Sequence, residues 1–388
     1  MQPVLFIHSG YRPFRNTLFK RLANLNIDFL FITHEKLFSP YGISLELKKV
    51  LKYKSLNLKG IKILNDSFGH SLDVTGVINL FLKLSKEIIK GSHKIIITAT
   101  EHPLHSKIAF LWAKILKKRI IIWTESWHEM KYENFLMKIY HFAAKYVLKH
   151  ADAILVHGTA QKNYCKKLGI SENKLFLFNH CSNDLLSQNI KSDIKKELGI
   201  QNKKIILYIG RIIRLKGLDV LIKAFSRLEK NCGDSLFLLI CGNGDFTQDC
   251  KSLAGELKVK NIKFMGTISP DDVPQFLYFS DLFVHPARAI KDQVEGWGLV
   301  INEAASAGKP IITTDAVGAA PDLVKNGWNG YIVKNGDIYD LYEAMFKIIS
   351  DEKLMMEMGK NSRKIFEEFN DYDKAIKELK KAIDYVKV

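Results

Sequence analysis

Short apolar runs alternate with longer segments of helical periodicity along most of the chain. In order, the runs read VLFIHS, DFLFITH, KIIITAT, RIIIWTE and AILVHG, and then KIILYIGR, LFLLICGNG, IKFMG, LFVHPA and KPIITTD. Strands that alternate with helices in this way are typical of parallel sheets covered by helices. The pattern therefore predicts an α/β protein with two such sets of strands.

A polar stretch over about 179–204 interrupts this rhythm, and a new apolar run begins at Ile205. With 388 residues, 47% of them hydrophobic, the chain has the length of roughly two domains of about 100–200 residues each. We expect a first domain over 1–188, a second over 189–365 and a helical segment over 366–388. An apolar stripe on that last segment has the spacing to pack against either domain, and it consists of Ala375, Ile376, Leu379, Ile383 and Val386.

The sequence disfavours a membrane-spanning or secreted protein, and also a protein held together by disulfides or zinc. No apolar run approaches the roughly 18 residues of a membrane span, and the apolar part of the opening MQPVLFIHSG is too short for a signal peptide. The five cysteines are odd in number and show no C-x-x-C pair, so they indicate neither a disulfide framework nor a zinc site. We expect a cytoplasmic protein.

Positive charge is concentrated in the first half of the chain. Residues 1–190 hold 28 Lys and Arg against 13 Asp and Glu, a net charge of +15 out of the total of +17. Such a basic half indicates an anionic partner, which is a phospholipid surface, a nucleic acid or an acidic substrate. The alternative is that the lysines serve only solubility.

The stretch EGWGLVINEAASAGKPIITTD contains two carboxylates on either side of a glycine-bearing turn. Its glycines allow the backbone to approach a ligand closely, and a helix that begins near Gly298 presents unpaired N–H groups that suit a phosphate. Glu303 lies about 7–8 Å further along that helix, where a carboxylate accepts hydrogen bonds from ribose hydroxyls. Glu295 precedes the turn and faces the other side of the phosphate, where a sugar would lie. The alternative is that both acids are solvated charges.

A second motif, YIGRIIRLKGLDVLIKAF, places Arg211 just after a strand and Lys216 five residues later, before an apolar helix. Two cations on a strand-to-helix loop match the phosphate region of an open parallel sheet. A metal ion is then not needed to neutralise a phosphate, and the one D-x-D, Asp371-Tyr372-Asp373, is far along the chain from these motifs.

Together, these two motifs resemble those of the retaining glycosyltransferases of family 4, also called group 1, which have the GT-B fold of two Rossmann-like domains facing across a cleft. The resemblance is clear over about 205–335, where CGNGD, FMGTISPDDVPQFLYFSDLFVHPA and VKNGWNGYIVKNGD also match, and weaker over 1–190. It implies an acceptor-side domain first, a nucleotide-sugar domain second and a final helix that crosses back to the first domain.

The resemblance also implies roles for individual residues. Arg211 and Lys216 would hold the donor diphosphate, and Glu303 would hold the ribose. Glu295 would contact the donor sugar. Further donor-binding positions are the backbone amides of Gly298, Leu299 and Val300, the loop at Gly10 after the first strand, and Ile268 in MGTIS near the nucleotide base.

The family often carries a histidine at the end of a central strand of the first domain, within reach of the reacting sugar. Here that strand continues as IIIWTESWHEM, so Glu125 occupies the nearest position and His128 follows three residues later. His102 in TEHPLHS is another candidate. We predict His128 as a catalytic residue beside Glu295, Arg211 and Lys216, with Glu125 and His102 left open.

The resemblance predicts transfer of a sugar from a nucleoside diphosphate sugar to an acceptor hydroxyl with retention, without a metal or other cofactor. The expected acceptor is a glycan or a lipid-linked glycan of the bacterial envelope. A sugar-nucleotide epimerase on the same fold is the first alternative. A nucleic-acid-binding protein is the second, although the basic half shows no recognisable motif with interleaved aromatic residues, and we expect no nucleic-acid partner.

Two basic segments of the first half suggest a peripheral contact with an anionic membrane. One contains Lys48, Lys49, Lys52, Lys54, Lys59 and Lys62, and the other, FLMKIYHFAAKYVLKH, mixes Lys138, Lys145 and Lys149 with apolar residues. A handful of basic residues near a negatively charged surface gives reversible attachment without a membrane span. The alternative is a solubilising surface together with one core helix.

Overall fold

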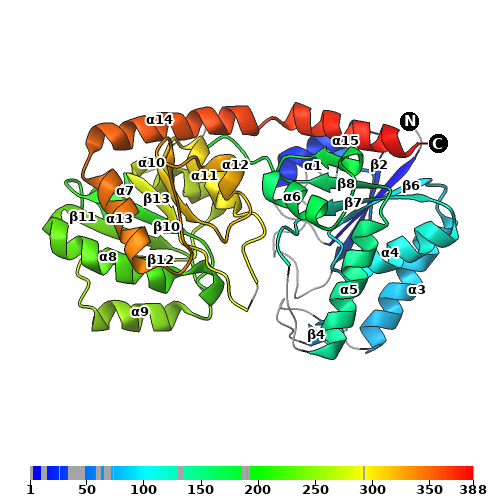
Figure 1. Ribbon diagram of the computed structural model, residues 1–388, viewed down its shortest axis with the longest axis horizontal. Coiled ribbons are helices and arrows are strands. Elements are labelled where there is room, and N and C mark those ends of the chain that lie inside the picture. Colours follow the sequence, from blue (N-terminus) through cyan, green and yellow to red (C-terminus); the bar gives the residue numbers. More distant parts are fainter. Residues whose placement is uncertain are drawn as a thin grey trace.

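A computed structural model of the chain contains two α/β domains side by side, joined along one side by the last two helices (Figure 1). It describes residues 3–9, 15–25, 27–33, 49–57, 63–64, 71–72, 74–129, 134–185, 190, 193–291 and 293–387. None of the described helices is both long and apolar enough to span a bilayer.

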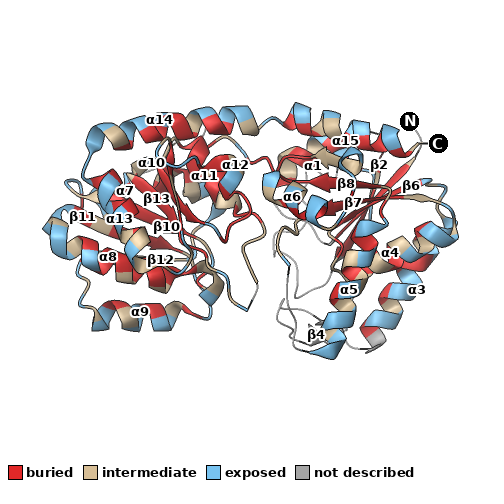
Figure 2. Cartoon of the chain, in the orientation of Figure 1, coloured by how far each residue is buried: buried red, intermediate tan, exposed pale blue. Residues whose placement is uncertain are grey.

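The first domain is built on a parallel sheet in the order β3-β2-β1-β6-β7-β8-β9. The strands are β1 (Val4–Ser9), β2 (Ile27–Thr33), β3 (Tyr53–Asn57), β6 (Ile95–Ala99), β7 (Arg119–Thr124), β8 (Ala153–Val156) and β9 (Leu175–Leu177), and the small antiparallel pair β4 (Ile63–Leu64) and β5 (Ser71–Leu72) is separate. Its helices are α1 (Asn16–Leu22), α3 (Val74–Lys90), α4 (Leu104–Ile115), α5 (Phe135–Lys149) and α6 (Thr159–Lys167). The central strands are buried along their length, as expected when helices cover both faces of a parallel sheet (Figure 2).

The second domain repeats this plan with a parallel sheet in the order β12-β11-β10-β13-β14-β15. The strands are β10 (Lys204–Ile209), β11 (Leu236–Cys241), β12 (Ile262–Gly266), β13 (Leu282–His285), β14 (Ile311–Thr314) and β15 (Gly330–Val333). Its helices are α7 (Ile194–Glu197), α8 (Leu218–Cys232), α9 (Thr247–Glu256), α10 (Val273–Phe279), α11 (Leu299–Ser306), α12 (Ala320–Leu323), α13 (Ile338–Ile349) and α14 (Glu352–Phe369). The predicted α/β class with two parallel sheets is confirmed.

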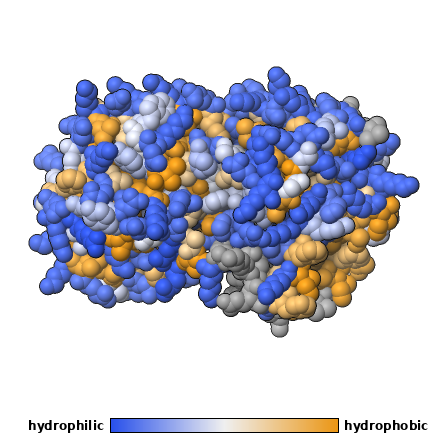
Figure 3. All heavy atoms as spheres, in the orientation of Figure 1, coloured by the Kyte–Doolittle hydropathy of each residue, from blue (hydrophilic) through white to orange (hydrophobic). Residues whose placement is uncertain are grey.

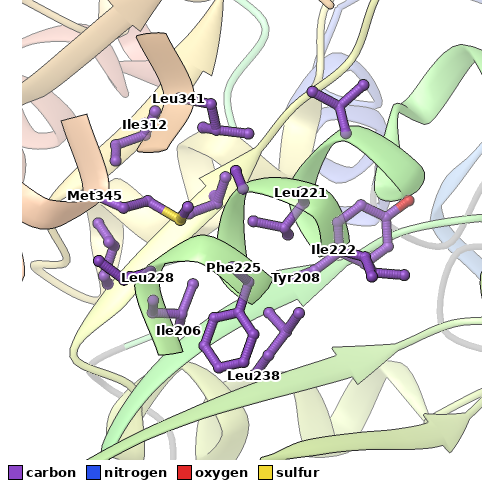
Figure 4. Close-up of a cluster of buried hydrophobic side chains, with 14 of the residues drawn as sticks. Ile206, Tyr208, Leu221, Ile222, Phe225, Leu228, Leu238, Ile312, Leu341 and Met345 are labelled. Atoms are coloured by element: carbon purple, nitrogen blue, oxygen red, sulfur yellow. The ribbon is translucent and has the colours of Figure 1, made fainter. Parts of the chain in front are cut away.

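Apolar side chains fill the space between this second sheet and its helices. Figure 4 shows Phe225 and Leu221 of α8 beside Ile206 and Leu238 of the sheet, with Met345 of α13 next to them. All five side chains are fully or almost fully buried. This packing fixes the start of α8, and with it the loop that carries Lys216.

The last helix, α15 (Tyr372–Val386), belongs to the core of the first domain although it follows the second domain in sequence. Leu379 and Ile383 are fully buried in the same apolar cluster as β1, β2 and β7. The preceding helix, α14, packs on the second domain through Ile365 and Phe366. The break between α14 and α15 is the point where the chain crosses between domains (Figure 1).

A second crossing of the chain lies beside this one. Arg363 of α14 binds Asp184 through two hydrogen bonds of 2.7 Å, and Asn179 Nδ2 donates to the Phe369 carbonyl at 2.8 Å. The predicted domain boundary at 188 and 189 falls outside the described residues. The described part shows that both connections between the domains are tied together by hydrogen bonds.

Candidate active site

The helix α11 begins at a turn that only glycine adopts easily. Gly298, its N-cap, has φ of 90°, and a Cβ atom there would lie 3.0 Å from a methyl group of Val317. The amides of Leu299 and Val300 follow in the first turn of the helix, where N–H groups have no partner within the helix. This end of α11 therefore has the geometry and partial positive charge to bind a phosphate.

Lys216 and Glu295 form an ion pair of 2.6 Å at this site. Lys216 ends a short 3-10 turn (Arg214–Lys216) before α8, and Glu295 lies on the loop before α11. Their side chains are only 12% and 16% exposed. Burial acts to raise the pKa of Glu295, but Lys216 and the more distant Arg211 hold that pKa below its usual value. Glu295 is thus held as a carboxylate beside Lys216.

Arg211 is an exposed residue just after β10, and the Tyr208 hydroxyl fixes its backbone by donating to the Arg211 carbonyl at 2.9 Å. Ile268 lies after β12, the edge strand of the sheet, and is half-buried against the apolar cluster of this domain. Lys216, Glu295 and the start of α11 therefore lie together in the structure. Arg211 is close enough to lower the pKa of Glu295, and Ile268 lies at the edge of the same domain.

Glu303 lies on α11, and its side-chain carboxyl makes no hydrogen bond or ion pair with any residue that the structure describes. Burial raises the pKa of its carboxyl from 4.5 to about 7. A carboxylate that is desolvated and unpaired costs folding free energy. It also offers acceptor oxygens to a ligand that carries hydroxyl groups.

This cost gives a pH-dependent prediction. Because the pKa of Glu303 is raised in the folded state, the stability that depends on its protonation is fully present at pH 4 and is lost as pH rises toward about 7. We expect Glu303→Gln to raise the melting temperature at pH 8 by roughly 5 °C and to change it little at pH 4. Thermal unfolding monitored by circular dichroism at both pH values measures this. Equal shifts at pH 4 and pH 8 would contradict it.

The first domain contributes a carboxylate, Glu125, directly after β7. Arg15 binds it at 2.9 Å, and His157 Nε2 lies 3.7 Å from the same oxygen. Burial favours protonation, but the nearby His157 ring and the charge of Arg15 hold the pKa of Glu125 well below its usual range. A Cβ atom on Gly296 would lie 4.0 Å from Glu125 Oε2, so this carboxylate faces the glycine-bearing turn of the second domain.

Rings from both domains pack behind Glu125. Trp123 Nε1 donates to His157 Nδ1 at 3.1 Å, which leaves the proton of neutral His157 on the nitrogen that faces Glu125. His157 stacks on His180 with ring centroids 4.5 Å apart, and both rings approach Trp297, the residue between the two glycines of the turn. The glycine-bearing turn is thereby held against the first domain.

Hydrogen bonds between the domains hold the same turn. Trp127 Nε1 donates to the Glu295 carbonyl at 2.8 Å, and Gln161 Nε2 donates to the Gly296 carbonyl at 3.1 Å. Thr159 Oγ1 donates to Asp322 at 2.6 Å nearby. Sequence reasoning did not find these residues, because nothing in the local pattern distinguishes them from ordinary strand ends and helix starts.

The two histidines singled out in the sequence contact residues of the first domain. His128 is half-buried beside the ring of Trp127, with centroids 5.9 Å apart. His102 contacts Ser126 at 3.0 Å and Glu101 at 3.5 Å, both within the first domain. Gly10 falls outside the described residues. Of the candidates Glu125, His128 and His102, Glu125 is the one whose carboxylate faces the glycine-bearing turn of the second domain.

A fully buried histidine that the sequence reasoning did not select, His285, ends β13 beneath the site. Burial, together with Lys216, lowers its pKa to about 3, so the ring is neutral. Its Nε2 lies 3.5 Å from the position of a Cβ atom on Gly298. Within the described ranges, His, Cys, Asp and Glu side chains form no group of three or more that could hold a metal ion.

Comparison with solved structures identifies the fold. The fold is similar over the whole chain to that of Anabaena HepE in complex with UDP and glucose, with a TM-score of 0.77 and 17% identity. It is also similar to the sucrose-phosphate synthase of Thermosynechococcus elongatus, with a TM-score of 0.76, 18% identity and complete coverage of both chains. The predicted GT-B fold is confirmed.

Sequence similarity to known proteins is found as well. Residues 190–365 match the family described as glycosyl transferases group 1. An uncharacterized glycosyltransferase of Methanocaldococcus jannaschii is 24% identical over 80% of each chain. A GDP-mannose-dependent monoacylated alpha-(1-6)-phosphatidylinositol monomannoside mannosyltransferase of Corynebacterium glutamicum is 32% identical over 45% of each chain. Over residues 190–365, the chain is therefore similar to the group 1 glycosyltransferases.

Proposed function

We propose that this protein transfers a sugar from a nucleoside diphosphate sugar to an acceptor hydroxyl, with retention of the anomeric configuration and without a metal ion. The observation that carries the proposal is the buried pair of Lys216 and Glu295 at the start of α11, opposite Glu125 of the first domain. Anabaena HepE, which has the same fold, binds UDP and glucose.

In the proposed reaction, the bond between the anomeric carbon and the diphosphate oxygen breaks, and the diphosphate gains negative charge. Lys216, Arg211 and the first amides of α11 stabilise this charge. A preorganised donor of this kind contributes about 3 kcal/mol to the transition state. The positive end of the α11 dipole acts in the same direction.

The sugar becomes cationic at the anomeric carbon as the bond breaks. Glu295 accepts hydrogen bonds from the sugar hydroxyls, and Glu125 places a second negative charge beside it. Retention requires the acceptor hydroxyl to attack from the face that the diphosphate leaves. The departing phosphate oxygen can then take the acceptor proton, so this scheme needs no separate base.

For the acceptor we propose a glycan or a lipid-linked glycan of the bacterial envelope, reached from the cytoplasm. The C. glutamicum relative is named for its action on a phosphatidylinositol monomannoside. The charge of the first domain supports an anionic acceptor or surface, since residues 1–190 carry nearly all of the net charge.

A screen of nucleotide sugars tests the function. We expect one donor to raise the melting temperature, and the same donor to yield a nucleoside diphosphate together with a glycosylated acceptor. Excess chelator should leave most of this activity in place, because cations of the protein neutralise the diphosphate. Complete loss that magnesium or manganese restores would contradict the metal-independent scheme. Conversion of the donor to a new free sugar nucleotide would indicate an epimerase.

A further inference from the structure

Large apolar side chains are exposed on three helices of the first domain. On α5, Phe135, Leu136 and Phe142 are 73%, 72% and 70% exposed. The other exposed apolar residues of this surface are Val77, Ile78, Phe81, Leu82 and Ile89 on α3, Leu111 and Ile115 on α4, and Ile139 and Tyr146 on α5. We call this set the three-helix surface. Figure 3 shows apolar atoms gathered at the lower right of the molecule, where Figure 1 places α3 and α5.

The three helices form one continuous surface. Trp112 of α4 donates to the Ser85 hydroxyl of α3 at 2.7 Å, and the ring of Phe110 on α4 meets that of Tyr146 on α5 at 6.0 Å. Exposed apolar residues scattered singly over a protein are ordinary, but a contiguous group marks an interaction site.

The charges on the three-helix surface have one sign. Its exposed charged residues are Lys83, Lys86, Lys90, Lys114, Lys138 and Lys149. The one acid within the three helices, Glu87, is half-buried and pairs with Lys54 at 2.7 Å. Lysines beside apolar side chains are the composition of a segment that lies in the interface of an anionic bilayer.

We propose that the three-helix surface docks on a bilayer that contains anionic phospholipid. The aromatic and aliphatic side chains enter the interface, and the lysines pair with the phosphates of the headgroups. A second copy of this chain fits less well, because it would set lysine against lysine. This inference rests on the proposed function, because it places the acceptor-side domain on a membrane. Binding to vesicles can nevertheless be measured without the transfer reaction.

Vesicle co-sedimentation with the full chain tests the proposal. We expect binding to vesicles of phosphatidylglycerol and phosphatidylcholine, little binding to phosphatidylcholine alone, and weaker binding at high salt. The triple variant Phe135→Ser, Leu136→Ser, Phe142→Ser should bind the anionic vesicles roughly tenfold more weakly. The matched control is Tyr339→Ser with Met356→Ser, which removes exposed apolar side chains from the second domain and should bind as the native protein does.

Three outcomes would overturn the proposal. They are no binding to anionic vesicles at low salt, equal binding by the triple variant and the native protein, and a dimer in light scattering that the triple variant abolishes, which would identify a second copy as the occupant. Release of nucleoside diphosphate from the donor should be the same in the triple variant and the native protein. Failure of the proposed transfer reaction would therefore be seen separately from failure of lipid binding.

Discussion

Replacing Lys216 with alanine is expected to lower turnover about a hundredfold, on the scale of losing one preorganised donor to the leaving diphosphate. The side chain is 12% exposed and lies 2.6 Å from Glu295, so its ammonium group is held in place at the site. Arg211→Ala should lower turnover by a similar factor, because Arg211 follows β10 on the same side of the site. Steady-state release of nucleoside diphosphate measures both.

The control for this prediction is Lys230→Ala, which removes an exposed lysine from the last turn of α8, the helix that begins just after Lys216. It should retain native turnover. Because Lys216→Ala leaves Glu295 buried without its cation, a melting curve must accompany the rate measurement. Near-native turnover in both Lys216→Ala and Arg211→Ala would remove these residues from the reaction.

Replacing the two acids of the glycine-bearing motif separately is expected to divide nucleotide binding from sugar transfer. Glu303→Ala should weaken binding of the bare nucleoside diphosphate about tenfold, because the ribose hydroxyls lose a desolvated acceptor. Glu295→Ala should leave that binding intact, since Lys216 is then free to meet the phosphate, but it should lower sugar transfer by at least a comparable factor.

Isothermal titration calorimetry of both variants with nucleoside diphosphate decides between the roles. A 2′-deoxy analogue provides the matched ligand, because it should lose affinity for the native protein but not for the Glu303 variant. If Glu295→Ala alone lost the nucleotide, the roles of the two acids would be reversed.

Most of the predicted strands are buried on both faces, and the edge strand β12 was predicted as well from its run IKFMG. Each of the apolar runs became a strand, and Gly298 does precede a helix, because local apolar patterning and helix-start chemistry determine these elements. Strands β3, β9 and β15 were not predicted. They lie at sheet edges, where YKSLN, LFL and GYIV are too short or too polar to stand out.

The candidate site was only partly predictable, for a different reason. Lys216, Glu295 and Glu303 lie in motifs that local chemistry explains. Arg15 and His157 meet Glu125 from positions far away in sequence, so only the fold brings them together. Two lysines of the first basic segment, Lys52 and Lys54, pair with Asp28 and Glu87 while their side chains stay exposed, and the sequence pattern gave no sign of these long-range pairs.

The position of α15 has a consequence for how the protein is made. Its residues Leu379 and Ile383 complete the core around Phe178, yet the ribosome produces them only after the whole second domain. At about 5–20 residues per second, the apolar face that α15 covers stays open on the order of ten seconds or longer. The second domain, although later in sequence, is thus free to fold before the first is finished. The open face of β7 and β8 is where a nascent-chain chaperone would bind.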